Sequence, residues 1–192
     1  MTTVYFVRHA ESPKTDLDER TRGLTDGGQM AAQHVTTYLK DKKIDLFFSS
    51  PYQRSLLTIE GAALYFGKDI QIDEDLRECD FSGQNQTMPQ ADVYPLVRQM
   101  FADHTFSRDG SETFRSCQHR GVQSLTAILK NHPGKRIVIG THGLIMTTIL
   151  HHFDAMYDFD FLRQTTKPDI YRLTFTGTEL VTVSRITLPL YD

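Results

Sequence analysis

The chain has 192 residues, of which 39% are hydrophobic and 23% charged, a balance typical of a folded globular protein. It carries 21 Lys and Arg against 24 Asp and Glu, and the resulting formal charge of −3 argues against a general nucleic-acid binder. No apolar run reaches bilayer-spanning length, and the N-terminal apolar stretch is too short for a signal peptide. We therefore expect a single domain over residues 1–192 with no membrane or nucleic-acid partner.

Apolar strand-like runs alternate with helix-like stretches along the chain. In order, the patterns predict a strand at 4–7, a helix that buries Met30, Val35 and Leu39, a strand at 44–48, a helix from about 51 to 66 and a strand at 70–72. A helical excursion from about 88 to 106, a helix from about 110 to 131, a strand at 136–140, a helix at 143–153 and a hairpin of residues 171–175 and 180–186 follow. This order predicts a three-layer α/β/α fold with a mainly parallel sheet. Residues 83–110 are expected to form a short helical cap.

Three predicted strand or helix boundaries carry polar residues. Arg8-His9 follows the first strand, residues 50–54 follow the second, and residues 141–143 follow the strand at 136–140. Ligands of parallel α/β sheets bind beyond the carboxyl ends of the strands, so these segments are expected to meet at one rim. Ser50 and Pro51 are a favoured N-cap and first helical residue, which places Arg54 in the first turn of its helix.

The rim residues predict a phosphate site. Arg8 and Arg54 can contact an oxyanion bidentately, and the first turn of a helix also favours an anion. The backbone N–H groups of residues 141–143, including Gly143, can add donors. No carboxylate is expected to match this positive charge, so the pocket should bind phosphate or a phosphoryl group.

Two imidazoles, those of His9 and His142, are expected at the same pocket. One of them can attack phosphorus as a nucleophile and form a phosphoenzyme. The leaving oxygen then needs a proton from an acidic residue. By position, Glu78 is the best candidate for this acid, and Asp80 is the fallback.

The sequence also resembles the histidine phosphatase superfamily, which includes the cofactor-dependent phosphoglycerate mutases. The matching blocks are Val7 to Ser12, Leu24 to Gly28, Ser49 to Pro51 with Arg54, Leu76 to Glu78, Gly110 to Glu112 and Thr141 to Gly143. They occur in the family's order over residues 4 to about 150. The resemblance implies a phosphoglycerate mutase-like fold and no cofactor or metal.

The resemblance assigns a role to each matched residue. His9 would be the phosphorylated nucleophile. Arg8, Arg54 and His142 would bind phosphate, with His142 also taking part in catalysis. Glu78 would protonate the leaving group and later activate water.

This sequence departs from the family pattern at several places. Thr15 stands where many members have Asn, and Ser82 and Gly83 follow the acid where many members have another pattern. The stretch rich in Asn, Trp and Phe that mutases carry after the first motif is absent, and the middle insertion is short. These features favour a metal-independent phosphomonoesterase for a small phosphorylated metabolite. A phosphoglycerate mutase-type phosphotransferase and a non-catalytic phosphate-binding module are the alternatives.

The remaining polar residues are expected to have ordinary roles. Arg20 and Arg22 lie in a loop near the rim, where contact with substrate and simple solvation are equally plausible, and Arg115 and Arg120 are expected on an exposed helix face. Two cysteines, Cys79 and Cys117, cannot form a disulfide framework. They fit a reducing compartment or are simply small buried hydrophobic residues, and we expect the protein to be cytoplasmic.

Overall fold

The computed structural model describes residues 1–14, 18–83, 87–108 and 110–188. Its strands are β1 (Thr2–Arg8), β2 (Leu46–Ser49), β3 (Ile70–Ile72), β4 (Arg136–Thr141), β5 (Asp169–Thr176) and β6 (Glu179–Ile186). Its helices are α1 (Asp26–Leu39), α2 (Gln53–Phe66), α3 (Gln90–Ala102), α4 (Phe114–Asn131), α5 (Gly143–Phe153) and α6 (Phe159–Gln164). Two short 3-10 turns are η1 (Lys40–Lys42) and η2 (Glu74–Leu76). Thr15, singled out by the sequence, lies outside the described residues.

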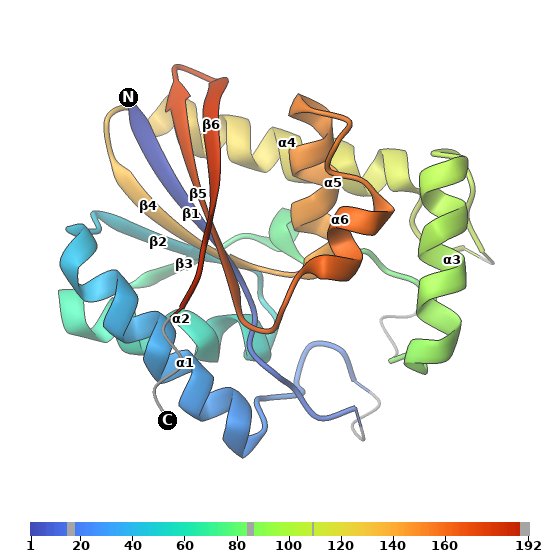
Figure 1. Cartoon of the computed structure of the whole chain (residues 1–192), viewed down its shortest axis with the longest axis horizontal. Helices are drawn as coiled ribbons and strands as arrows, with labels where there is room; N and C mark the ends of the chain where they lie inside the picture. The colour runs from blue at the N-terminus through green and yellow to red at the C-terminus, as the bar shows by residue number, and fades with distance from the viewer. Residues whose placement is uncertain (15–17, 84–86, 109, 189–192) are drawn as a thin grey trace.

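The strands form one sheet in the order β3-β2-β4-β1-β5-β6. The four strands from β3 to β1 are parallel, whereas β5 and β6 are added antiparallel. Figure 1 shows α1 and α2 on one face of the sheet and α4, α5 and α6 on the other, while α3 lies at the end of the molecule. This arrangement confirms the predicted three-layer α/β/α fold with a mainly parallel sheet.

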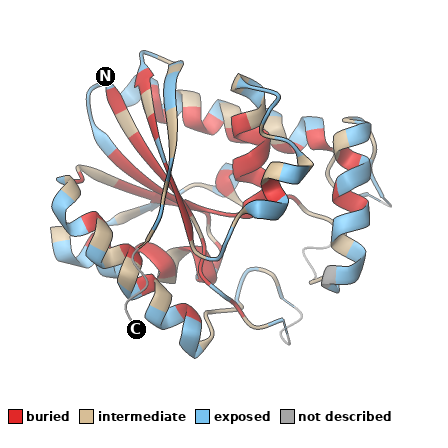
Figure 2. Ribbon diagram, in the orientation of Figure 1, coloured by how far each residue is buried: buried red, intermediate tan, exposed pale blue. Residues whose placement is uncertain are grey.

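The central strand β1 is buried on both faces, as its unbroken apolar sequence predicts (Figure 2). Val4 and Phe6 pack in the core beneath α4 and α5, and Tyr5 and Val7 pack in the core beneath α1 and α2. This anchoring from both sides fixes the end of β1, where Arg8 and His9 lie.

The C-terminal hairpin also matches the prediction. β5 and β6 pair antiparallel about a turn in which Gly177 has a φ of 60°, a left-handed conformation that favours glycine. None of the helices in the described ranges is long and apolar enough to cross a membrane.

Two local predictions are wrong. Met30 is 63% exposed, because α1 begins at Asp26 and its buried stripe runs through Ala32, Val35 and Leu39. Helix α2 begins at Gln53 and not at Pro51. The hydroxyl of Ser50 does not cap this helix, because it is used in the site described below.

Candidate active site

The structure brings the predicted rim residues together at the carboxyl ends of β1, β2 and β4. Arg8 pairs with Thr141 in the parallel register of β1 and β4. One residue further, the backbone N–H of His9 donates to the carbonyl of Thr141 at 3.0 Å, and that of Ser50 donates to the carbonyl of Gly140 at 3.0 Å. Ladder hydrogen bonds therefore continue past the strand ends and fix the backbone from which the site side chains project.

The ring of His9 is buried and has a defined tautomer. Its Nδ1 lies 2.6 Å from the carbonyl oxygen of Ala10, which can only accept, so Nδ1 carries the hydrogen and Nε2 carries a lone pair. Burial, and then the positive charges of Arg54, Lys167 and Arg8, lower the pKa of His9 well below 6.5. The ring is therefore neutral at neutral pH, with Nε2 available as a nucleophile.

His142 lies beside His9, with the ring centroids 5.2 Å apart. Its Nε2 is 2.7 Å from the hydroxyl of Ser50, and that hydroxyl already accepts a hydrogen bond from the backbone N–H of Tyr52 at 3.1 Å. The Ser50 oxygen has a second lone pair, so Nε2 of His142 can either accept the hydroxyl hydrogen or donate to this oxygen. The buried Nδ1 of His142 has no protein partner among the described residues.

Arg8 is held by a part of the chain that the sequence did not indicate. Its Nη1 donates to the backbone carbonyl of Thr165 at 3.1 Å and to the hydroxyl of the same residue. Gly143 permits this placement, because a Cβ there would lie 2.9 Å from the Arg8 Cζ. The Arg8 Nε is buried and has no partner in the described part of the chain.

Arg54 is almost completely buried and forms an ion pair that the sequence did not predict. Its Nη1 donates to the backbone carbonyl of Glu19 at 2.5 Å, and its Nη2 lies 2.6 Å from the carboxylate of Glu19. The same carboxylate pairs with Arg22 at 2.9 Å. Burial, opposed by Glu19, lowers the pKa of Arg54 to about 10, which still leaves it charged at neutral pH. The expectation that no carboxylate meets the positive rim is therefore wrong.

Glu78 lies at the N-terminus of α5, where free backbone N–H groups favour a carboxylate. Its Oε2 accepts from the N–H of Leu144 at 3.1 Å, and its Oε1 accepts from the N–H groups of Ile145 at 2.9 Å and Cys79 at 3.0 Å. Glu78 lines one pocket with Arg8, His9 and Arg54. The Glu78 carboxylate, the His9 ring and both guanidinium groups therefore share a single cavity.

The Asp80 carboxylate forms hydrogen bonds within its own loop, although Asp80 also lines the pocket. Its Oδ1 accepts hydrogen bonds from the backbone N–H and the hydroxyl of Ser82 and from the backbone N–H of Gly83, at 3.0 to 3.1 Å. These bonds shape the turn that leads into the cap. Glu78 and Asp80 therefore both line the pocket, and both carboxylates accept hydrogen bonds from backbone N–H groups.

The pocket is lined by both cationic and apolar side chains. Sequence reasoning missed Lys14, Glu19 and Lys167, which line the pocket with Arg22. No motif marks these residues, because loop folding alone brings them to the rim. The apolar lining residues come from the loop after Glu78, from the cap and from α5 and α6, and they include Phe81, Met88, Val93, Val97, Leu144 and Leu162.

The two cysteines form a disulfide, which corrects the expectation of free thiols. Cys79 and Cys117 are bonded to each other with their Cα atoms 5.8 Å apart, and both residues are buried. Glu112 lies within 4.8 Å of the two sulfurs, but bonded sulfurs are not thiolate ligands. The bond also removes the argument that these cysteines indicate a reducing compartment.

The fold and the site together define an α/β protein with a cationic pocket that contains His9. The family model of the histidine phosphatase superfamily (branch 1) matches residues 4–185, and the chain belongs to this superfamily. The resemblance read from the sequence is therefore confirmed.

Known proteins of this kind are similar over most of the chain. Phosphoglycerate mutase-like protein 4 of Arabidopsis thaliana is 28% identical over 158 residues, which are 76% of this chain and 68% of that protein. The uncharacterized phosphatase PhoE of Bacillus subtilis is 26% identical over 155 residues, 78% of this chain and 76% of that protein. The structure of phosphoserine phosphatase from Entamoeba histolytica in complex with 3-phosphoglyceric acid superposes with a TM-score of 0.78 at 21% identity, covering 97% of this chain and 98% of that one.

Proposed function

We propose that this protein is a metal-independent phosphomonoesterase that acts on a small phosphorylated metabolite through a phosphohistidine at His9. One observation carries the proposal. Three buried nitrogens of the expected phosphate ligands, the Nε of Arg8, the Nε of Arg54 and the Nδ1 of His142, have no partner in the described residues. Unpaired buried donors are costly, and a tetrahedral oxyanion would satisfy them.

The chemistry follows from the tautomer of His9 and the charges of the site. The substrate phosphate binds Arg8, Arg54, His142 and the N–H of Gly143, and Nε2 of His9 attacks phosphorus in line. The bond from phosphorus to the ester oxygen breaks as the N–P bond forms, and a protonated Glu78 gives its proton to the leaving oxygen. The arginines stabilise the charge on the equatorial oxygens.

The second half of the cycle uses the same groups. Glu78, now ionised, takes a proton from water, and the water oxygen attacks phosphorus. The N–P bond breaks, inorganic phosphate leaves, and His9 returns neutral with its lone pair restored. Glu78 is then protonated and ready to act again as the acid.

The substrate class follows from the pocket and is supported by the relatives. We propose that residues 83–110, of which 84–86 and 109 lie outside the described residues, cap the leaving group with the apolar residues of α3. The names of the phosphatases listed above, one of them bound to 3-phosphoglyceric acid, favour a small phosphate ester. The Arabidopsis relative carries the mutase name, so hydrolysis has to be separated from transfer by experiment.

Purified protein is expected to release inorganic phosphate from small phosphate esters at the same rate with and without EDTA, and vanadate should inhibit it. A panel of phosphorylated metabolites, assayed for both phosphate release and phosphoglycerate interconversion, checks this. Interconversion without net phosphate release would indicate a mutase. Loss of activity in EDTA that a divalent ion restores would indicate a metal hydrolase. Phosphate binding without hydrolysis of any ester would indicate a binding module.

The acid limb of the pH–rate profile is expected to lie below pH 6.5. The pKa of His9 is well below 6.5 in the folded chain, so Nε2 keeps its lone pair until the pH falls through that lowered value. The measurement is kcat/KM against pH for two esters whose phosphate pKa values differ, because only the limb common to both belongs to the enzyme. A half-maximal rate at pH 6.5 or above, or a rate that never falls, would contradict the assignment of His9.

A further inference from the structure

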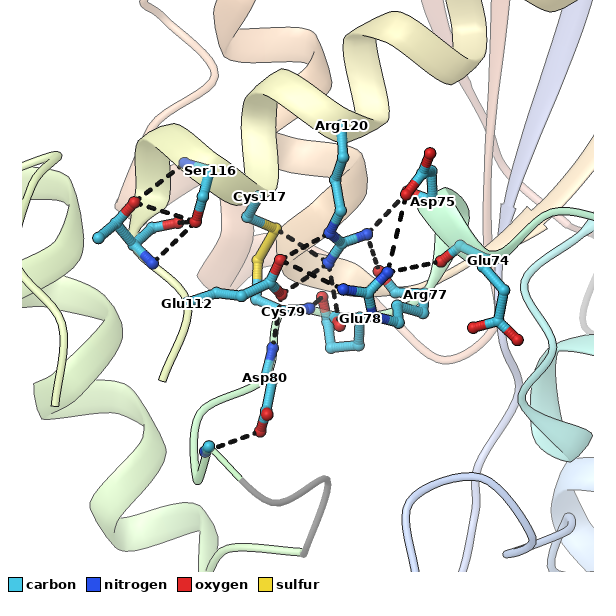
Figure 3. A network of polar contacts seen from close by, with 12 residues as sticks. Glu74, Asp75, Arg77, Glu78, Cys79, Asp80, Glu112, Ser116, Cys117 and Arg120 are labelled. Atoms are coloured by element: carbon cyan, nitrogen blue, oxygen red, sulfur yellow. Dashed lines mark hydrogen bonds and ion pairs between the residues drawn. A yellow bond between two sulfur atoms is a disulfide. The ribbon is translucent and has the colours of Figure 1, made fainter. Parts of the chain in front are cut away.

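Arg120 lies in α4, where the sequence predicts an exposed face, but the residue is only 8% exposed. Its guanidinium reaches beneath the segment that carries Glu78 (Figure 3). Nη1 donates to the backbone carbonyls of Asp75 at 2.7 Å and Arg77 at 2.8 Å, and Nη2 donates to the carbonyl of Glu78 at 3.2 Å. One side chain therefore holds three carbonyls of the same short segment.

Glu112 contacts both Arg120 and the backbone of the same segment. Its carboxylate accepts from Nε and Nη2 of Arg120 at 2.7 and 2.8 Å. One of its oxygens also accepts from the backbone N–H of Asp80 at 2.9 Å, and its own N–H donates to the carbonyl of Asp80 at 2.9 Å. The Arg120–Glu112 pair therefore forms hydrogen bonds with the backbone both before and after Cys79.

The disulfide adds a covalent bond at Cys79, the residue between these two sets of hydrogen bonds. Cys79 directly follows Glu78, and its partner Cys117 lies on α4 one turn before Arg120. The Nη2 of Arg120 lies 3.6 Å from the Cys117 sulfur. Helix α4 therefore anchors this segment through one guanidinium and one disulfide, and Glu112, just before α4, adds one carboxylate.

The segment needs such anchors because residues 77–83 lie outside helices and strands. An acid contributes fully only when it is held within hydrogen-bond reach of the oxygen that it protonates. We propose that Arg120 is a positioning residue for Glu78, which sets the acid against the leaving group without touching the substrate. This inference rests on the proposed function, in which Glu78 is the acid.

Leaving groups of different acidity separate a positioning role from a structural one. An alkyl phosphate needs protonation of its leaving oxygen, whereas p-nitrophenyl phosphate needs little. Because kcat/KM reports only the steps up to transfer to His9, Arg120→Gln should lower it about 30-fold for the alkyl ester and less than about 3-fold for the aryl ester. Glu78→Gln should show the same split, and the double variant should lose no more than about 3-fold beyond Glu78→Gln alone.

Arg115→Gln is the matched control, because this exposed arginine of α4 undergoes the same chemical change away from Glu78. If Arg120→Gln does not fold, Arg120→Lys keeps the charge beside Glu112 but has only three N–H donors, too few for the three carbonyls and Glu112 together, and it should show the same split at smaller size. An equal loss on both esters, no loss on either, or an additive double variant would overturn the positioning role. A wild-type chain that hydrolyses neither ester would overturn the proposed function instead.

Discussion

His9→Ala is expected to lower kcat/KM by about 10⁵-fold or more, because the variant lacks the nitrogen that attacks phosphorus. The two arginines expected to bind phosphate should keep their positions in this variant. Arg8 keeps its bonds to Thr165, and Arg54 keeps its pair with Glu19. Phosphate binding, measured by calorimetry, should therefore change by less than about 10-fold, since binding and nucleophilic attack use different groups.

His119→Ala is the control for this variant, because His119 is exposed on α4 and should keep the activity of the wild type. Steady-state kinetics on the ester with the highest wild-type rate decides the matter. A His9→Ala protein with near-normal turnover would show that another group attacks phosphorus.

Arg54→Gln is expected to lower kcat/KM by about 10²- to 10³-fold, the usual cost of removing a preorganised donor to a developing oxyanion. The buried guanidinium neutralises the phosphoryl oxygens, and an amide cannot replace its charge or its fork of N–H groups. Arg54→Lys should recover only part of the loss. The phosphate affinity should fall with the rate, because Arg54 contacts the anion in the ground state too.

Arg20→Gln is the control for Arg54→Gln, because it tests whether the loss of another nearby arginine has the same effect. Arg20 forms an exposed pair with Glu74 at 2.8 Å, so its loss should change kcat/KM by less than about 2-fold. An Arg54→Gln variant that performs as well as Arg20→Gln would remove Arg54 from the phosphate site.

Much of the fold could be predicted from the sequence because its strands have clear patterns. The unbroken apolar run Val4 to Val7 indicates a strand buried on both faces, and helix α5 begins and ends at the predicted residues. The rim could be predicted for the same reason. Parallel strands end at one edge, so polar residues that directly follow β1 and β4 must lie near each other.

The errors share a physical cause, since they depend on contacts between segments far apart in sequence. Arg120 reads as a surface residue of α4 until the acid loop folds against it. Glu19 carries no motif, and only the path of its loop places its carboxylate on Arg54. Cys79 and Cys117 are separated by 38 residues, and no local pattern indicates that their sulfurs meet.

Ser50 is not the N-cap of α2, although the sequence predicts this role for it. Its position before Pro51 fits the statistics of helix starts, yet its hydroxyl forms a 2.7 Å hydrogen bond with Nε2 of His142 and so holds that ring in place. An N-cap contributes about 1 kcal/mol, which is less than the cost of leaving a buried imidazole nitrogen without its hydrogen-bond partner. Such departures from local rules are expected at functional sites.

A phosphoryl group on His9 is the species that most directly tests the proposed mechanism. The Glu78→Gln variant should accumulate it with p-nitrophenyl phosphate, because His9 can still be phosphorylated while water is no longer activated. Quenching during turnover, followed by mass spectrometry of the peptides, should locate acid-labile and base-stable phosphate on His9. The His9→Ala variant should carry none. Phosphate on a serine or cysteine, or an unmodified His9 during continued turnover, would contradict the mechanism.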